Sequence, residues 1–125
     1  MKRPSVGQLG ELRARRLLES AGLKILETNW RCPEGEIDLI AADGDVVVFV
    51  EVKTRRGTLF GQPEDSLTRD KRRRLQRAAV AYLQSVDRLD AAWRIDVVTV
   101  RGDPRRGARL EHLVDVVEAD EDSLW

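Results

Sequence analysis

Residues 35–53 read GEIDLIAADGDVVVFVEVK, and they contain two largely apolar runs on either side of Asp43 and Gly44. Asp-Gly is a preferred pair for the two-residue loop of a β-hairpin. We therefore expect antiparallel strands at 36–42 and 46–53. The second run begins VVVFV, which is apolar on both faces of a strand. Such a run is typical of a strand inside a sheet that helices cover on both sides.

The turn also predicts the register of this hairpin. If the Asp-Gly pair fills the loop, Ala42 pairs with Asp45 across it. Counting back along both strands puts Glu36 directly opposite Glu51, and Asp38 diagonal to Glu51. Residues two apart in a strand share a face. Four charged side chains are therefore expected on one side of the sheet: Glu36, Asp38, Glu51 and Lys53.

This group of charges predicts a metal site. Carboxylates directly across a strand pair repel each other, and Lys53 supplies one compensating positive charge. A Mg²⁺ or Mn²⁺ ion bound by Asp38 and Glu51 would supply further positive charge. Carboxylate oxygens are the ligands that Mg²⁺ prefers. A metal held in this way polarises a phosphate and lowers the pKa of a bound water molecule, while a nearby lysine stabilises charge. The alternative is an exposed edge with ordinary ion pairs, and Glu36 itself is expected to face solvent.

The first helix is expected at residues 8–20, where Ala14, Leu17 and Leu18 follow the spacing of one apolar stripe. Glu11 shares the face of Ala14 and Leu18, so it is expected to project toward the sheet. Two interpretations of Glu11 remain open. It is either a further acidic member of the site or a carboxylate at the positive end of the helix dipole.

The rest of the chain alternates further strands with a second helix. We expect strands at residues 23–30, 93–100 and 110–117, a loop at 54–65, and a helix at 68–84. These elements predict an α/β fold with a central mixed sheet of about five strands flanked by helices. We expect one domain over residues 1–117 and an acidic C-terminal tail over residues 118–125.

Positive charge is concentrated at the start of the second expected helix. Lys71 and Arg74 lie nearer the buried side of that helix and are placed to reach the acidic cluster. Five other arginines are candidate contacts for a nucleic-acid backbone: Arg55, Arg56, Arg72, Arg73 and Arg77. The alternative is a solvated helix face. Because phosphate contacts carry no base sequence information, we expect any preference to be for the shape of the substrate.

Composition narrows the classes of function. The 125 residues carry 22 Lys and Arg and 22 Asp and Glu, and a net charge of zero argues against a protein that coats DNA through a uniformly basic surface. No apolar run approaches the roughly 20 residues of a membrane span, and no signal peptide is apparent. We therefore expect a cytoplasmic protein without membrane contact. Cys32 is the single cysteine, which excludes an intrachain disulfide. Arg94 and Asp96 are expected to pair, and His112 is expected to be either hydrogen-bonded or exposed rather than a ligand or general base.

Several motifs together resemble the YraN family of small bacterial proteins. They are GEIDLIA at 35–41, VFVEVK at 48–53, Phe60-Gly61, and RIDVV at 94–98. The YraN family is in turn similar to the Holliday-junction-resolvase branch of the P-D-x(n)-(D/E)-x-K nuclease superfamily. One departure is Ile37, which stands where the superfamily has a proline.

The resemblance implies a restriction-endonuclease-like sandwich and a Mg²⁺-dependent endonuclease. Asp38 and Glu51 would be the metal ligands, Lys53 the catalytic lysine, and Glu11 the acidic residue that such nucleases carry on their first helix. The expected partner is nucleic acid, with DNA favoured and branched DNA in particular, cut by a homodimer. Two other functions stay open: a non-catalytic nucleic-acid-binding module with the nuclease fold, and a protein-interaction subunit.

Overall fold

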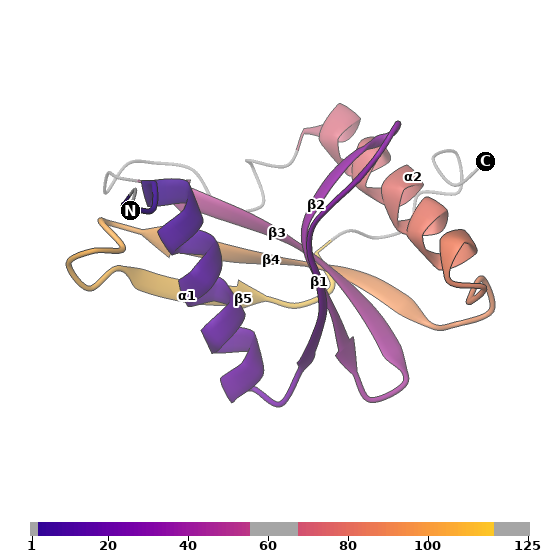
Figure 1. The fold of residues 1–125 in the computed structure, drawn as a ribbon, viewed down its shortest axis with the longest axis horizontal. Helices are drawn as coiled ribbons and strands as arrows, with labels where there is room; N and C mark the ends of the chain where they lie inside the picture. The colour runs from indigo at the N-terminus through magenta and orange to yellow at the C-terminus, as the bar shows by residue number, and fades with distance from the viewer. Residues whose placement is uncertain (1–2, 56–67, 117–125) are drawn as a thin grey trace.

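Two helices and five strands follow one another in the part of the chain that the computed structural model describes, residues 3–55 and 68–116. Their bounds are α1 Val6–Ser20, β1 Lys24–Cys32, β2 Gly35–Asp43, β3 Val46–Arg55, α2 Arg69–Ser85, β4 Trp93–Arg101 and β5 Arg109–Leu113. The strands form one sheet in the order β1-β2-β3-β4-β5, in which β3 and β4 run parallel and the other neighbours antiparallel (Figure 1). The predicted α/β sandwich, a mixed five-stranded sheet flanked by helices, is therefore confirmed.

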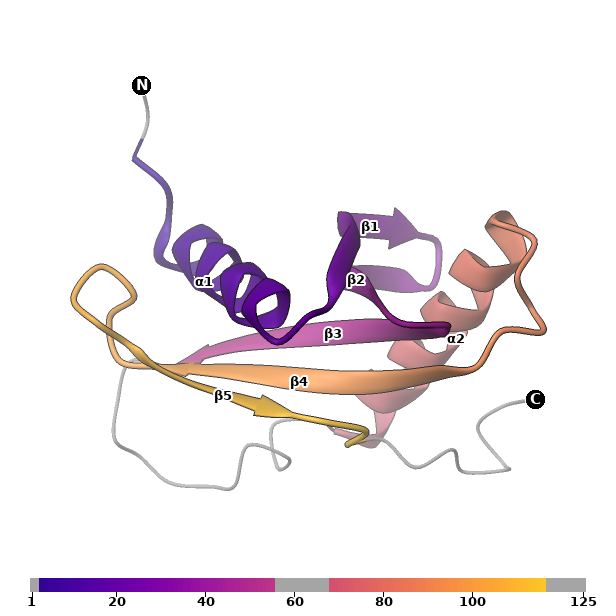
Figure 2. The ribbon, with the colours of Figure 1, turned by 90° about the horizontal axis from the view of Figure 1, so that it is seen from below.

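The helices pack on opposite faces of the sheet. On one face Val48 and Val50 of β3 pack in a cluster with Leu18 of α1. On the other face Phe49 packs in a cluster with Leu75 of α2. Figure 2 shows the sheet edge-on with α1 on its upper side. Burial from both sides explains why the apolar run of β3 is uninterrupted.

The start of α1 lies close to the end of β3. Ser5 and Gln8 form a capping box, in which the Gln8 N–H donates to Ser5 Oγ (3.1 Å) and the Ser5 N–H donates to Gln8 Oε1 (2.8 Å). Gly10 is buried in α1, and an added Cβ there would collide with the hydroxyl of Thr54. The absence of a side chain at Gly10 thus lets α1 approach β3 closely, which brings Glu11 toward the strand.

The β2–β3 hairpin has a different register from the expected one. Asp43 pairs with Val46, so the loop consists of Gly44 and the residue after it. Gly44 has a φ of +58°, which glycine adopts without steric cost, and it takes the first loop position. The predicted pairing of Glu36 with Glu51 is wrong for this reason. The observed register differs from the predicted one by two residues. Because side chains alternate between the faces of a strand with a period of two, they keep the predicted faces.

β2 separates from β3 halfway along its length. Its pairing with β3 ends at Leu39, whereas its pairing with β1 continues to Gly35. The register of β1 and β2 shifts between Ile25 and Glu27. Further along β1, Asn29 has a φ of +50°, in the left-handed region that asparagine tolerates better than most residues. The outer half of this hairpin approaches α2 (Figure 1), where Trp30 packs edge-to-face on Tyr82 with 5.3 Å between ring centroids.

The last strand is shorter than predicted. A strand was expected at 110–117, but β5 ends at Leu113. Two residues later Asp115 has a φ of +55°, and its N–H donates to Asp96 Oδ1 at 2.9 Å. This hydrogen bond to β4 takes the place of continued strand pairing.

Some expectations fall partly or wholly outside the described residues. The loop expected at 54–65 begins later than predicted, because β3 extends through Arg55, and residues 56–67 are not among those described. The acidic tail at 118–125 is likewise outside them. Within the described ranges, neither helix combines the length and the apolar character needed to cross a membrane.

Candidate metal site

A cleft of about 240 Å³ opens where β2 separates from β3, beside the first turns of α2. Its lining residues are Gly35, Glu36, Asp38, Glu51, Lys71, Arg74 and Leu75. Both residues expected as metal ligands, Asp38 and Glu51, therefore line one cleft. The cleft has an acidic wall from the two strands and a basic wall from the helix.

Asp38 interacts with the backbone of β3 through its side chain. Its Oδ2 accepts a hydrogen bond from the Val52 N–H at 2.8 Å. This bond lies just beyond the last backbone pair between the two strands, which is Leu39 with Val50. Burial, and then the negative charge of Glu51, raise the pKa of Asp38 to about 7. The carboxyl group is therefore held in an environment that disfavours its ionised form unless a cation is near.

Glu51 is almost fully buried, with 7% of its surface exposed. Its Oε1 accepts from Lys53 Nζ at 3.2 Å and from Lys71 Nζ at 3.0 Å. Burial, together with the neighbouring ammonium group of Lys71, lowers the pKa of Lys53. The expectation that Lys71 and Arg74 reach toward the acidic cluster is confirmed, because Lys71 bonds to Glu51 and Arg74 lines the cleft.

Glu11 belongs to the same cluster through Asn29. With its amide nitrogen turned toward the carboxylates, Asn29 donates to Glu36 Oε1 at 3.1 Å and to Glu11 Oε2 at 3.2 Å. Burial raises the pKa of Glu11; the Asn29 hydrogen bond opposes this rise, and the charges of Glu36 and Glu51 add to it. Glu11 thus faces the acidic group across the sheet as well as lying early in its helix. Glu36 is exposed, as expected, yet it lines the cleft.

Asn29 is the residue of this site that the sequence patterns did not single out. It lies inside β1, although asparagine is depleted in strands and enriched among residues with positive φ. An asparagine within an expected strand was therefore the sequence signal that could have identified this residue. Its backbone has a positive φ within β1, and its side chain joins α1 to β2.

The donor set suits an open Mg²⁺ or Mn²⁺ site. Asp38 and Glu51 offer carboxylate oxygens to one cleft. Within residues 3–55 and 68–116, no group of three or more His, Cys, Asp or Glu side chains that could hold a metal ion is found. Mg²⁺ is commonly bound by one or two carboxylates and keeps several water molecules. Two carboxylates in a solvent-accessible cleft therefore fit such an ion, whereas a closed structural zinc site needs four protein ligands.

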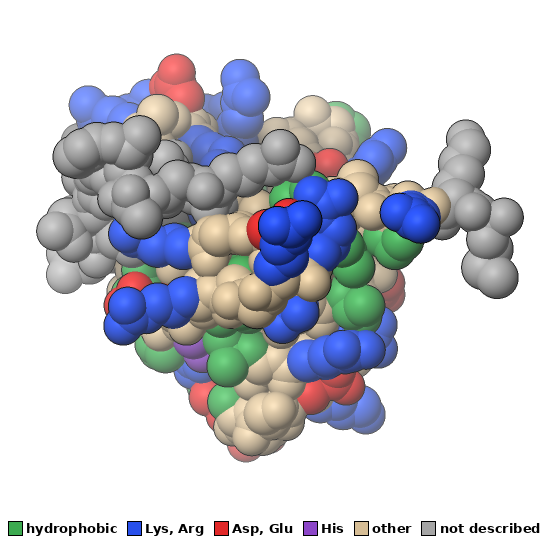
Figure 3. Space-filling view, turned by 90° about the vertical axis from the view of Figure 1, so that its left-hand side faces the viewer, with side chains coloured by type: hydrophobic (Ala, Val, Ile, Leu, Met, Phe, Trp, Pro, Cys, Tyr) green, Lys and Arg blue, Asp and Glu red, His purple; other side chains and the backbone are tan. Residues whose placement is uncertain are grey.

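The arginines expected to contact nucleic acid are only partly described. Arg72 and Arg77 are exposed on α2, and Arg73 is half-buried. Arg55 is in β3, paired with Arg101, but its side chain and all of Arg56 lie outside the described residues. Figure 3 shows Lys and Arg side chains predominating on the end of the molecule where α1 begins and β4 leads into β5.

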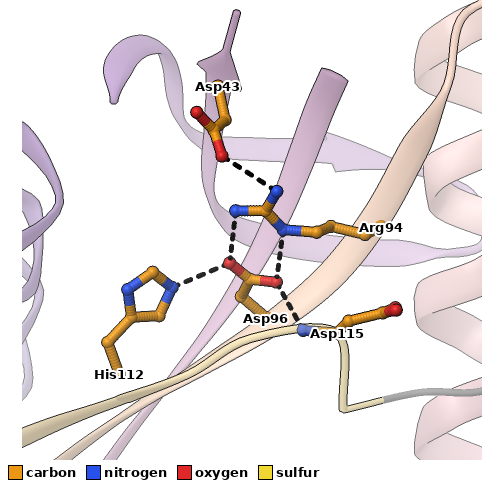
Figure 4. Close-up of polar contacts among 5 residues, drawn as sticks. All are labelled: Asp43, Arg94, Asp96, His112 and Asp115. Atoms are coloured by element: carbon orange, nitrogen blue, oxygen red, sulfur yellow. Dashed lines mark hydrogen bonds and ion pairs between the residues drawn. The ribbon is translucent and has the colours of Figure 1, made fainter. Parts of the chain in front are cut away.

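A second polar cluster lies away from the cleft and is centred on Asp96, which is fully buried (Figure 4). Arg94 binds Asp96 through two nitrogens, at 3.0 and 3.3 Å, and binds Asp43 at 3.0 Å. His112 Nε2 lies 2.7 Å from Asp96 Oδ2. The predicted pairing of Arg94 with Asp96 is confirmed, as is a hydrogen-bonded His112. This cluster joins β4 to β5 and to the β2–β3 turn.

Comparison with known proteins identifies the family. The model of Uncharacterised protein family UPF0102 matches residues 10–100. A UPF0102 protein of Beutenbergia cavernae is 49% identical over 109 residues, which cover 87% of this chain and 92% of that protein. One from Moorella thermoacetica is 48% identical over 100 residues, covering 80% and 83%, and one from Syntrophus aciditrophicus is 48% identical over 113 residues, covering 90% and 87%. The chain therefore belongs to UPF0102, the YraN family that its sequence motifs resemble.

Proposed function

We propose that this protein is a metal-dependent nuclease that hydrolyses phosphodiester bonds in nucleic acid, with branched DNA as the favoured substrate. One observation carries the proposal: Asp38 and Glu51 line a single cleft, with the ammonium group of Lys53 bonded to Glu51. Carboxylates beside a lysine are the groups that metal-assisted phosphodiester hydrolysis needs. The resemblance of the YraN family to Holliday-junction resolvases supports the same reaction class.

Each residue of the proposed site has a distinct role. Asp38 and Glu51 would hold Mg²⁺ or Mn²⁺, and when bound such an ion polarises the phosphate and activates water. Lys53 keeps an ammonium group beside Glu51, where it stabilises negative charge and orients the attacking water. Glu11, held by Asn29, would be a further catalytic carboxylate at the edge of the cluster.

Arginines around the cleft would bind the phosphate backbone. Arg72, Arg73 and Arg77 on α2 are the described members of this group, and Arg55 and Arg56 are proposed from the sequence. Backbone contacts position nucleic acid without reading its bases. The proposal therefore includes selection by shape, and a homodimer for a symmetric junction.

The test is a cleavage assay on labelled linear duplex and four-way-junction DNA with Mg²⁺, Mn²⁺ or EDTA. The parent protein should cut only with metal, and Asp38→Asn and Glu51→Gln should each reduce the rate by at least about a hundredfold, since each removes a ligand oxygen charge. Asp103→Asn, a change at an exposed turn away from the cleft, is the matched control and should cut normally.

Two other outcomes would replace the proposal. Binding of DNA without cleavage under any metal condition would favour a non-catalytic nucleic-acid-binding module. Neither binding nor cleavage of DNA or RNA would favour a protein-interaction subunit.

A further inference from the structure

Lys71 is a second cation on Glu51, and the proposed reaction as described above gives it no role. Its Nζ lies 3.0 Å from Glu51 Oε1, the same oxygen that Lys53 Nζ approaches at 3.2 Å. We infer that Lys71 is a mobile counter-charge: it competes with a divalent ion for Glu51 and, once displaced, binds a phosphate of the substrate in the cleft. This inference rests on the proposed nuclease function and assigns a further residue to it.

Of the two lysines, Lys71 is the one placed to move. The side chain of Lys53 is 18% exposed and projects from the same strand as Glu51, two residues further on. The side chain of Lys71 is 39% exposed and comes from the first turns of α2 across the cleft. A lysine ammonium on its flexible four-carbon stem can reach several positions from one backbone site. Lys53 is thus a fixed partner of Glu51, and Lys71 an exchangeable one.

Competition with a divalent ion follows from charge. In the described arrangement, the nearly buried carboxylate of Glu51 is bonded to two ammonium groups at one oxygen. A divalent ion on Glu51 would bring two more positive charges within a few ångströms of both, where repulsion in a partly buried site is strong. Departure of Lys71 relieves this repulsion and leaves Lys53 as the remaining ammonium group on that oxygen.

The displaced ammonium group of Lys71 can bind an anion in the cleft together with Arg74. Arg74 is three residues after Lys71, so both side chains leave the same side of α2, and both line the cleft. They form its basic wall, opposite Asp38 and Glu51. A phosphodiester between the two walls would have carboxylate-bound metal on one side and these two cations on the other, which is the arrangement that neutralises phosphate charge.

The first test measures Mn²⁺ binding to the full chain by calorimetry, without nucleic acid. Lys71→Met removes the ammonium group and keeps the length of the side chain, so Kd should fall roughly tenfold, the equivalent of one charge-assisted hydrogen bond that no longer has to be broken. Arg74→Met is the matched control, because within the described structure Arg74 lines the cleft without an ion pair to Glu51. Its Kd should fall by less than about threefold, from loss of long-range repulsion alone. Equal Kd values for the two variants would overturn the competition.

The second test measures DNA cleavage at saturating Mn²⁺. Lys71→Met should cut at least about tenfold more slowly than the parent although it binds the ion more tightly, because a phosphate contact is lost. Undiminished cleavage would overturn the phosphate role. Lys71→Gln gives the same comparisons with a polar side chain if the Met variant does not fold, as judged by circular dichroism. A parent protein that binds no Mn²⁺ contradicts the proposed function itself. A parent that binds Mn²⁺ and cuts DNA, with no tighter binding by either variant, contradicts only this inference.

Discussion

The charge on Asp38 is costly to the folded protein without metal. Burial and the nearby Glu51 raise its pKa to about 7, whereas an aspartate in an unfolded chain has a pKa of about 3.9. Between roughly pH 4 and 7 the folded protein retains a proton on Asp38 that the unfolded chain has released, so stability falls as pH rises through this window. The raised pKa of Glu11 acts in the same direction.

The variant Asp38→Asn should therefore flatten the pH dependence of stability. In EDTA, we expect the parent to lose on the order of 2 kcal/mol of unfolding free energy between pH 5 and pH 8 through Asp38, and the variant to escape most of this loss. Urea unfolding at both pH values measures the difference. Identical pH dependence in the two proteins would show that Asp38 ionises without penalty.

At the scale of the strand, Asn29 has a positive φ within β1, and its side chain bridges two carboxylates. Its φ of +50° costs an ordinary residue roughly 1–2 kcal/mol, and glycine almost nothing. Asn29→Ala should therefore be less stable than Asn29→Gly by about 1 kcal/mol, although both lose the amide. Urea unfolding of the two variants gives this difference. An alanine variant as stable as the glycine variant would mean that the positive φ at this position carries no cost for a residue with a side chain.

The Asp96 cluster links three parts of the sheet through one buried carboxylate. Asp96→Asn would leave the half-buried Arg94 paired only with the more exposed Asp43, and removing one member of a buried ion pair costs about 3–5 kcal/mol. Asp103→Asn serves as control, since Asp103 pairs with Arg105 on the surface and should change stability little. If Asp96→Asn and Asp103→Asn changed the free energy of unfolding equally, the buried cluster would stabilise the fold no more than a surface ion pair does.

The sequence predicted the elements well because their signals are local. The β2–β3 hairpin, the apolar run of β3 and Thr68 as N-cap of α2 are all observed, and the Lys71 N–H donates to Thr68 Oγ1 at 3.2 Å. The face shared by Asp38 and Glu51 was predictable from strand alternation. The register was not, because two placements of the loop were both compatible with the sequence and Gly44 took the position that needs positive φ.

The parts of the candidate site that the sequence did not predict depend on packing between segments that are far apart in the chain. Asn29 approaches Glu11 only because α1 lies close to β3, and Lys71 approaches Glu51 only once α2 is packed on the sheet. Helical spacing indicated the direction of Lys71 but not its partner oxygen. Such contacts are set by tertiary structure, which residue patterns describe only indirectly.

At the scale of the whole molecule, equal numbers of acidic and basic residues mean that nucleic-acid binding must depend on local surfaces. Replacing Arg72, Arg73 and Arg77 together by Ala should weaken binding to all DNA sequences. The slope of log K against log salt should become shallower by up to about 3, since fewer counterions are released. Fluorescence anisotropy across a salt series measures it, with Arg15→Ala plus Arg105→Ala as control, because both arginines already pair with acidic neighbours. An unchanged slope would indicate that these three arginines of α2 face solvent and do not contact DNA phosphates.

The central claim is that Asp38 and Glu51 form one divalent-metal site, and thermal unfolding with and without Mn²⁺ tests it most directly. An ion that binds only the folded protein stabilises it by about 2.7 kcal/mol at a concentration of 100 times Kd. We predict a clear rise in Tm with Mn²⁺ for the parent, and little or none for Asp38→Asn, which without metal should be at least as stable as the parent. Equal Tm shifts in both proteins, or none in the parent, would contradict the claim.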